Sequence, residues 1–199
     1  MLPESLKRFI ELFAKIPSIG PRQAQRIAFW FLRHDKNFIY SYSFALKNLA
    51  DNLKVCPQCF YVFENNNNEQ LCEICRNPNR NNKIIAVVEK ETDLITIEKT
   101  KKYNGLYHIL GGLALPTEDN LKDLRIKELI SRLKNNPQTE EVILAFSHTA
   151  SGDLTTLELE KILKNFKVKV TKLAIGLQRG AEVEFADEDT LINALENRK

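Results

Sequence analysis

Four cysteines constrain this chain more than any other feature of its sequence. They are the only cysteines in its 199 residues, and they form two identical pairs in the pattern C-x2-C-x12-C-x2-C. A two-residue gap lets both thiolates of a pair reach the same tetrahedral ion, and the second pair completes the coordination. The spacing therefore predicts one structural Zn²⁺ per chain, bound by Cys56, Cys59, Cys72 and Cys75.

Two disulfides or a redox-active dithiol pair are the alternatives to a metal site. The opening segment, MLPESLKRFIELF, alternates apolar and charged residues and lacks the apolar run of a signal peptide. No stretch approaches the roughly 20 consecutive apolar residues that a membrane span needs. We therefore expect a cytoplasmic protein with no membrane partner, where reducing conditions disfavour disulfides. Because four thiolates leave no position for water, the metal is expected to have no catalytic role.

Composition and charge place few further limits on function. The content of 43% hydrophobic and 28% charged residues is typical of a globular protein. Residues 1–80 contain eleven lysines and arginines against seven acidic residues, whereas the remainder contains eighteen against nineteen. The basic excess of the first part permits phosphate contacts but does not by itself indicate them.

The hydrophobic pattern divides the chain into four parts. Residues 1–54 show helical spacing, 55–80 hold the cysteines, 81–175 alternate strands with helices, and 176–199 form a C-terminal helical segment. Alternating strands and helices predict an α/β domain whose mostly parallel sheet is covered on both faces, within a multi-part α+β chain. The expected strands lie at 84–88, 106–110, 142–146 and 168–173; the expected helices lie near 92–99, 121–134 and 154–166, and a last helix begins at Asp187.

The segment Ile16-Pro17-Ser18-Ile19-Gly20-Pro21-Arg22 lies between two amphipathic helices and resembles the helix-hairpin-helix DNA-binding motif. Gly20 permits close approach of the backbone to a ligand, and a helix N-terminus favours an anion. Arg22 and Arg26 lie on one face of the second helix, so both are candidates for phosphate contacts. The motif usually carries a glycine where Ser18 stands, from which we expect a less open turn. The alternative is an ordinary helical corner with two solvated arginines.

Two carboxylates of the α/β part resemble part of the Toprim site of topoisomerases, primases and some nucleases. Glu89 follows the first expected strand and matches the glutamate that acts in proton transfer in that domain. Asp153 matches one aspartate of the D-x-D pair that holds magnesium there, but Ser151 stands at the other position. One carboxylate fewer weakens a magnesium site. We therefore expect a degenerate Toprim site without catalysis, in which Glu89 and Asp153 bind metal weakly, cap helices or pair with lysines.

The three parts in this order resemble the RecR family of bacterial recombination mediators over essentially the whole chain. The resemblance rests on 20–26, the cysteine pairs with Asn77-Pro78, 87–89, 142–145, 152–153, 174–176 and 180–187. It implies a non-enzymatic DNA-repair protein that acts with RecO and RecF to load the recombinase on single-stranded or gapped double-stranded DNA. It also implies a homo-oligomer, a dimer or a tetrameric ring, assembled through the N-terminal helices and the C-terminal segment. Two other hypotheses are a magnesium-dependent nuclease or primase-like enzyme, and a protein-interaction module in which zinc only stabilises the fold.

Overall fold

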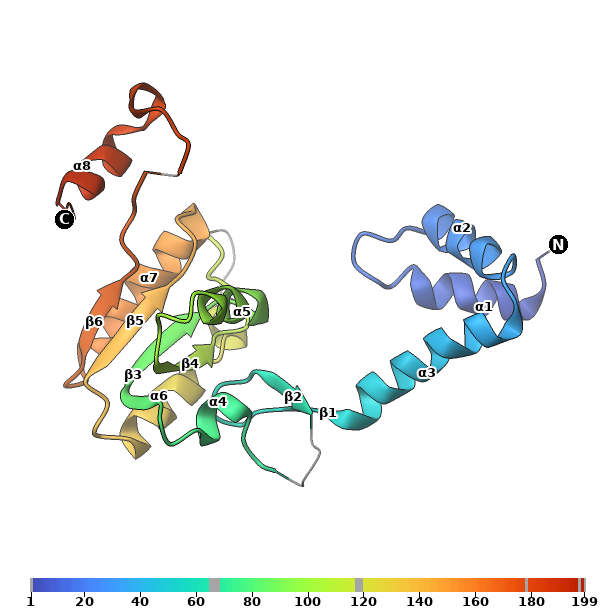
Figure 1. Ribbon diagram of the computed structural model, residues 1–199, viewed down its shortest axis with the longest axis horizontal. Coiled ribbons are helices and arrows are strands. Elements are labelled where there is room, and N and C mark those ends of the chain that lie inside the picture. The colour runs from blue at the N-terminus through green and yellow to red at the C-terminus, as the bar shows by residue number, and fades with distance from the viewer. Residues whose placement is uncertain (1, 65–68, 117–119, 178, 197, 199) are drawn as a thin grey trace. The chain divides into compact units, whose positions relative to one another are not determined.

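The chain folds into two compact units, residues 1–53 and 54–199. They are seen in a computed structural model that describes all residues except 1, 65–68, 117–119, 178, 197 and 199 (Figure 1). No helix within this described part combines the length and apolar character that crossing a bilayer demands.

The first unit consists of three helices held together by aromatic side chains. Phe9 of the first helix meets Phe31 of the second edge-on, with ring centroids 5.9 Å apart, and Phe31 meets Tyr42 of the third at 5.0 Å. Asp35 caps the third helix by accepting a hydrogen bond from the Phe38 N–H at 2.9 Å. The helices are α1 (Glu4–Phe13), α2 (Pro21–Phe31) and α3 (Lys36–Asn52).

The cysteines lie in a small module at the start of the second unit. Its short strands β1 (Leu53–Val55) and β2 (Val62–Glu64) form a two-stranded sheet, and the single-turn helix α4 (Glu73–Arg76) follows. The first cysteine pair lies in the turn between β1 and β2; in the second pair, Cys72 precedes α4 and Cys75 lies within it.

A four-stranded parallel sheet forms the centre of the second unit, and it confirms the predicted α/β domain. The spatial order is β4-β3-β5-β6, and all neighbouring strands are parallel. In the centre of the register, Val87 of β3 lies opposite His108 of β4 and Leu144 of β5. The strands are β3 (Asn81–Val88), β4 (Gly105–Ile109), β5 (Glu141–Ala145) and β6 (Lys169–Lys172).

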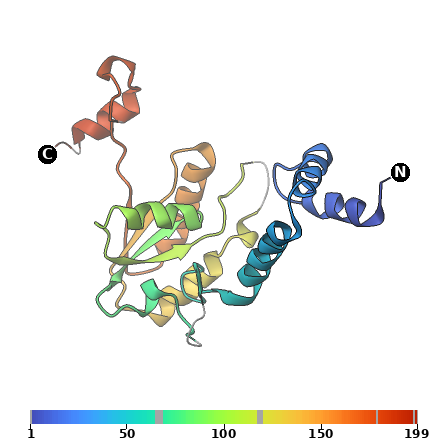
Figure 2. The same cartoon turned by 45° about the vertical axis from the view of Figure 1, so that its right-hand side comes forward.

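Alternate residues of each strand point to two separate hydrophobic clusters. Ile85 and Val87 face one side of the sheet and pack with apolar residues of α6 and α7. Ala86 and Val88 face the other side and pack with α5 and with the cysteine module. Figure 2 shows α5 in front of the sheet and α7 behind it. These helices are α5 (Glu91–Lys99), α6 (Ile126–Asn135) and α7 (Ala150–Leu163); α8 (Glu188–Glu196) follows near the C-terminus.

Two helices begin at positions different from those predicted. The helix expected at 154–166 begins at Ala150, because Thr149 accepts a hydrogen bond from the Gly152 N–H and caps it. The helix expected at 121–134 is divided into a 3₁₀ turn at Leu121–Asp123 and α6. Asp187 does cap the last helix, as predicted, by accepting from the Thr190 N–H at 2.8 Å.

Candidate metal centre and nucleic-acid interface

The fold brings the four cysteines into one compact cluster. Their sulfur atoms all lie within 4.8 Å of one another, and the Sγ atoms of Cys59 and Cys72 are 3.4 Å apart. A tetrahedral zinc site with Zn–S bonds of about 2.3 Å has sulfur–sulfur edges of about 3.8 Å. The donor set therefore fits a tetrahedral thiolate site. Cys56, Cys59 and Cys72 are buried and Cys75 is partly exposed.

Hydrogen bonds among the four sulfurs divide their charge unequally. The bond from Cys59, together with those from the other two sulfurs, lowers the pKa of the Cys56 thiol. The bond with Cys56, with smaller contributions from the others and from burial, raises the pKa of the Cys75 thiol. The mutual bonds thus lower the pKa of Cys56 and Cys72 and raise that of Cys59 and Cys75, so the four sulfurs by themselves do not all become thiolates. A bound divalent ion stabilises the thiolate form of all four cysteines, so that each sulfur can be deprotonated.

The first cysteine pair is attached to β4, the strand at one edge of the main sheet. The Ile109 N–H donates to the Cys59 carbonyl at 2.9 Å, and Arg132 donates to the Gln58 carbonyl at 2.9 Å. The Phe60 ring packs edge-on against buried His108 at 5.4 Å, and the Arg125 guanidinium lies 4.7 Å from its centre. The cysteine module thereby covers hydrogen-bonding groups that an edge strand would otherwise expose.

The hairpin between α1 and α2 has the backbone geometry of a tight turn. Ser18 adopts a φ of 66°, in the left-handed region that favours glycine, and the Ile19 N–H closes the turn on the Ile16 carbonyl at 3.0 Å. Ser18 therefore takes the conformation that a glycine would take at the same place.

Gly20 caps α2 with an extended backbone and no side-chain capping bond. A Cβ built on Gly20 meets no atom within 4 Å, so internal packing does not require a glycine there. Arg22 and Arg26 are both exposed on α2. The first-turn N–H groups, two guanidinium groups and an unobstructed backbone thus lie on one end of this helix.

The two predicted acidic residues lie near the carboxyl ends of neighbouring strands. Glu89 directly follows β3 and pairs with its neighbour Lys90, whose Nζ lies 3.9 Å from the Glu89 carboxylate. Asp153 is in the first turn of α7, whose cap is Thr149 rather than a carboxylate. Within the described residues, the cysteines form the only cluster of three or more possible metal ligands. Glu89 and Asp153 therefore belong to no such cluster.

Other residues of the site carry no signal in the sequence. Arg132 and Arg125 are on or just before α6, and Phe60 follows Cys59, but nothing in their spacing indicates that they join the module to β4. Burial lowers the pKa of His108 to about 4, so this histidine is a neutral packing partner. Only the tertiary contacts identify these residues.

Comparisons with known families cover three parts of the chain. Residues 6–53 match the family described as "RecR, helix-hairpin-helix", 83–174 match the Toprim domain, and 180–199 match "RecR, C-terminal".

Full-length relatives share about two fifths of their residues with this chain. The Recombination protein RecR of Clostridium perfringens is 41% identical over 197 residues, covering 98% of this chain and 96% of the relative. That of Gloeobacter violaceus is 41% identical over 200 residues, covering 100% and 99%. That of Gloeothece citriformis is 39% identical over 200 residues, covering 100% and 98%.

Proposed function

We propose that this chain, which belongs to the RecR family, is a DNA-binding mediator of recombinational DNA repair. In this proposal it acts with RecO and RecF, and it helps to load the recombinase on single-stranded or gapped double-stranded DNA. The helix-hairpin-helix turn holds the nucleic acid, and the Toprim domain offers surfaces to the protein partners.

The observation that carries the proposal is the open space beside Gly20. A glycine at φ −85° is not needed for backbone conformation, and a Cβ there would touch nothing inside the protein. We infer that the missing side chain leaves room for a ligand that approaches the backbone closely. A phosphate fits this description, since it would accept hydrogen bonds from the first-turn N–H groups and charge from Arg22 and Arg26.

Replacing Gly20 by alanine tests this reading without disturbing the fold. We expect Gly20→Ala to change the melting temperature only slightly, because the smaller entropy loss of alanine on folding is offset by its poorer fit at a helix N-cap. Its affinity for single-stranded and gapped DNA should nevertheless fall. Gly176→Ala is the matched control, because a Cβ at Gly176 also meets nothing within 4 Å. Equal DNA affinity of the wild type and Gly20→Ala, measured by fluorescence anisotropy at low salt, would exclude the close backbone approach.

The salt dependence of DNA affinity tests independently whether the two arginines contact phosphates. Each lost phosphate contact should reduce the slope of log affinity against log salt by about 0.7 on single-stranded DNA. Arg22→Ala with Arg26→Ala should therefore reduce it by about 1.4. Arg33→Ala removes an exposed charge just beyond the other end of α2 and should leave the slope unchanged. Unchanged binding by the double variant would favour a protein-interaction module instead.

We assign zinc to the cysteine cluster, with a structural role. Four converging sulfurs with no water-accepting position support this choice of metal and role. The proposal also places the protein in the cytoplasm, where thiols stay reduced and available to the metal. Metal content of the purified protein, measured by mass spectrometry, should be one zinc per chain.

We further propose that the Toprim domain has no catalytic activity. Ser151 in place of a carboxylate and the lack of a third ligand near Glu89 or Asp153, within the described residues, support this. The competing function is a magnesium-dependent nuclease or primase-like enzyme. Incubation with magnesium and varied DNA substrates separates the two, since cleavage or primer synthesis that is lost in Glu89→Gln would establish the enzyme.

Self-assembly completes the proposed function. The 17-residue helix α3 has no buried side chain within its own unit, and Phe44, Leu46 and Leu49 are each more than 60% exposed. Phe185, in the C-terminal segment, is 80% exposed. Such apolar exposure supports association through these two regions as a dimer or a tetrameric ring. Light scattering across protein concentrations, with and without gapped DNA, measures the state directly.

A further inference from the structure

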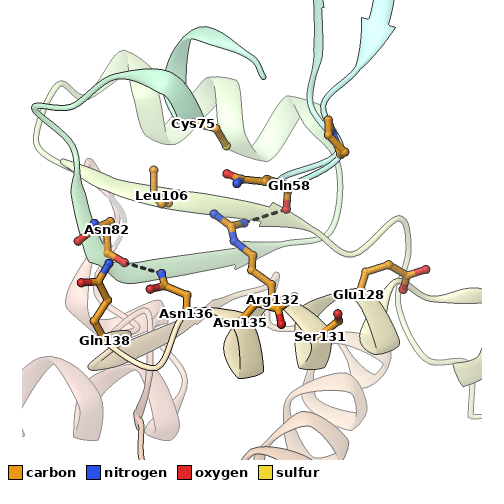
Figure 3. Close-up of a pocket in the computed structure, with 11 residues that line it drawn as sticks. Gln58, Cys75, Asn82, Leu106, Glu128, Ser131, Arg132, Asn135, Asn136 and Gln138 are labelled. Atoms are coloured by element: carbon orange, nitrogen blue, oxygen red, sulfur yellow. Dashed lines mark hydrogen bonds between the residues drawn. The ribbon is translucent and has the colours of Figure 1, made fainter. Parts of the chain in front are cut away.

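Arg132 extends from α6 into a polar cleft of about 550 Å³ beside the cysteine module (Figure 3). One terminal nitrogen, Nη1, donates to two backbone carbonyls, to Gln58 at 2.9 Å and to Tyr107 at 2.5 Å. Gln58 lies between the first two cysteines, and Tyr107 lies in β4. A single guanidinium group therefore reaches both the first cysteine pair and the edge strand.

The second terminal nitrogen of Arg132, Nη2, is buried and has no hydrogen-bond partner among the described residues. Burying a charged donor without an acceptor carries a desolvation cost that no hydrogen bond offsets. No ion pair of Arg132 is found within the same residues either, so its charge is not balanced by a carboxylate there. The best partner for a group with these properties is an acceptor that carries negative charge.

Two such groups line the same cleft, Glu128 and Cys75. Glu128 lies one helical turn before Arg132, but its carboxylate points away from the guanidinium group (Figure 3). Cys75 enters the cleft from the side opposite α6, facing the guanidinium group. Cys75 is also the partly exposed member of the cysteine cluster and the one cysteine among the residues that line the cleft.

A zinc ion bound by four thiolates has a net charge of −2, because four negative ligands surround a divalent cation. Thiolate sulfur remains a hydrogen-bond acceptor while it binds the metal, and groups that orient or neutralise the ligands strengthen such sites. The cluster therefore offers the negatively charged acceptor that Arg132 lacks. Arg132 in turn offers a positively charged donor that offsets the charge of the four thiolates.

We propose that Arg132 is an outer-shell positioning residue of the metal site, whose Nη2 donates toward the Cys75 thiolate and offsets its charge. This inference rests on the zinc site of the proposed function. Through the same side chain, the metal site is connected to the Gln58 and Tyr107 carbonyls and so to the edge of the main sheet.

Cobalt substitution tests the proposal, because Co²⁺ bound by thiolates has an intense sulfur-to-metal charge-transfer absorption. A donor and a positive charge at the sulfur stabilise its lone pairs and raise the energy of this transition. We expect the band of the Co²⁺-loaded full-length Arg132→Met protein to move to lower energy. Its zinc affinity, measured by chelator competition, should fall roughly 10- to 100-fold.

Two further variants separate this role from a purely structural one. Lys134→Met removes a positive charge from an exposed position of the same helix and should leave the band and the affinity unchanged. Arg132→Lys keeps the charge but loses the two-nitrogen fork, so its band and affinity should lie between those of the wild type and Arg132→Met. If Arg132→Met does not fold, Arg132→Lys still tests the proposal, because the energy of the charge-transfer band depends on the lone pairs of the ligating sulfurs.

The possible failures are distinguishable. A wild-type protein that binds no Co²⁺ or Zn²⁺ would contradict the metal site itself. A wild type with a tetrathiolate spectrum, and folded Arg132 variants with the same band and affinity, would overturn only the role of Arg132. In that case water or an amide oxygen of the cleft supplies the acceptor for Nη2.

Discussion

The Ile109 N–H donates a 2.9 Å hydrogen bond to the carbonyl of Cys59, and so joins the first cysteine pair directly to the edge strand of the parallel sheet. The same face of that sheet packs Ala86 and Val88 against the buried cysteines Cys56 and Cys72. The cysteine module is therefore part of the core of the second unit.

Loss of the metal should consequently destabilise residues 54–199 and leave the three-helix unit folded. We expect Cys72→Ser, a change at a side chain only 1% exposed, to abolish stoichiometric zinc binding. Hydrogen exchange measured by mass spectrometry should then show faster exchange in β3 and β4, with little change in α1 and α2. A chelator added to the wild type should reproduce this pattern. Equal acceleration in both units would contradict the assignment of the module to the second unit's core.

The conformation of Ser18 predicts opposite effects of two substitutions. Because Ser18 has a φ of 66°, Ser18→Gly should remove about 1 kcal/mol of backbone strain, partly offset by the greater freedom of glycine in the unfolded chain. Ser18→Val should destabilise by more than 1 kcal/mol, because a β-branched residue is strained there. Urea unfolding of the full-length variants measures both. If Ser18→Gly were as unstable as Ser18→Val, the serine hydroxyl and not the backbone conformation would determine the stability at this position.

Glu98 should make folding stability depend on pH. Arg80 donates two hydrogen bonds to its carboxylate, at 2.8 and 2.5 Å, and the Tyr107 hydroxyl donates a third at 2.7 Å. The Arg80 guanidinium, with a smaller contribution from Tyr107, holds the pKa of Glu98 below its usual range. A carboxylate with a lowered folded-state pKa stabilises the fold above its ordinary pKa of about 4.3. This stability is lost as the pH falls through the folded-state value.

Glu98→Gln should therefore lower the free energy of unfolding at pH 7 by roughly 1–3 kcal/mol. The free energy of unfolding of this variant should also fall less between pH 5 and pH 3 than that of the wild type. Glu140→Gln is the control, because Glu140 pairs with Lys83 at 2.7 Å on an exposed surface and should contribute at most about 1 kcal/mol. Urea unfolding across this pH range measures the difference. Parallel pH profiles of wild type and Glu98→Gln would show that the Arg80 pair does not control acid stability.

The exposed face of α3 predicts which changes disrupt self-association. Leu46→Glu with Leu49→Glu places two charges on side chains that are each 61% exposed, so the isolated chain should keep its helix content. Light scattering should nevertheless give a smaller assembly than that of the wild type. Lys47→Glu, at a neighbouring exposed position, should leave the mass unchanged. An unaffected assembly in the double variant would place the interface elsewhere, and the C-terminal segment around Phe185 would be tested next.

Local patterns in the sequence account for most of the elements. The β-branched run before Glu89 forms a buried strand, and Asp187 caps the last helix, because both depend on residues close in the chain. The start of α7 was predicted four residues too late. Ser151 and Gly152 are typical of loops, and the capping bond from the Gly152 N–H to Thr149 outweighs that tendency. Gly152 also fits a close approach, since a Cβ there would lie 1.9 Å from the Ser147 carbonyl oxygen.

The sequence by itself identified the four cysteines as candidate metal ligands, since two pairs with two-residue gaps suit one tetrahedral ion. Its alternating strand and helix patterns also determined a parallel α/β sheet. Tertiary structure alone decided what surrounds those ligands. Arg132 is 60 positions after Cys72 in the chain, and its contact with Gln58 exists because β4 lies at the sheet edge between α6 and the cysteine module. Periodicity specifies which face of an element is buried, whereas the order of strands in the sheet decides which distant side chains meet.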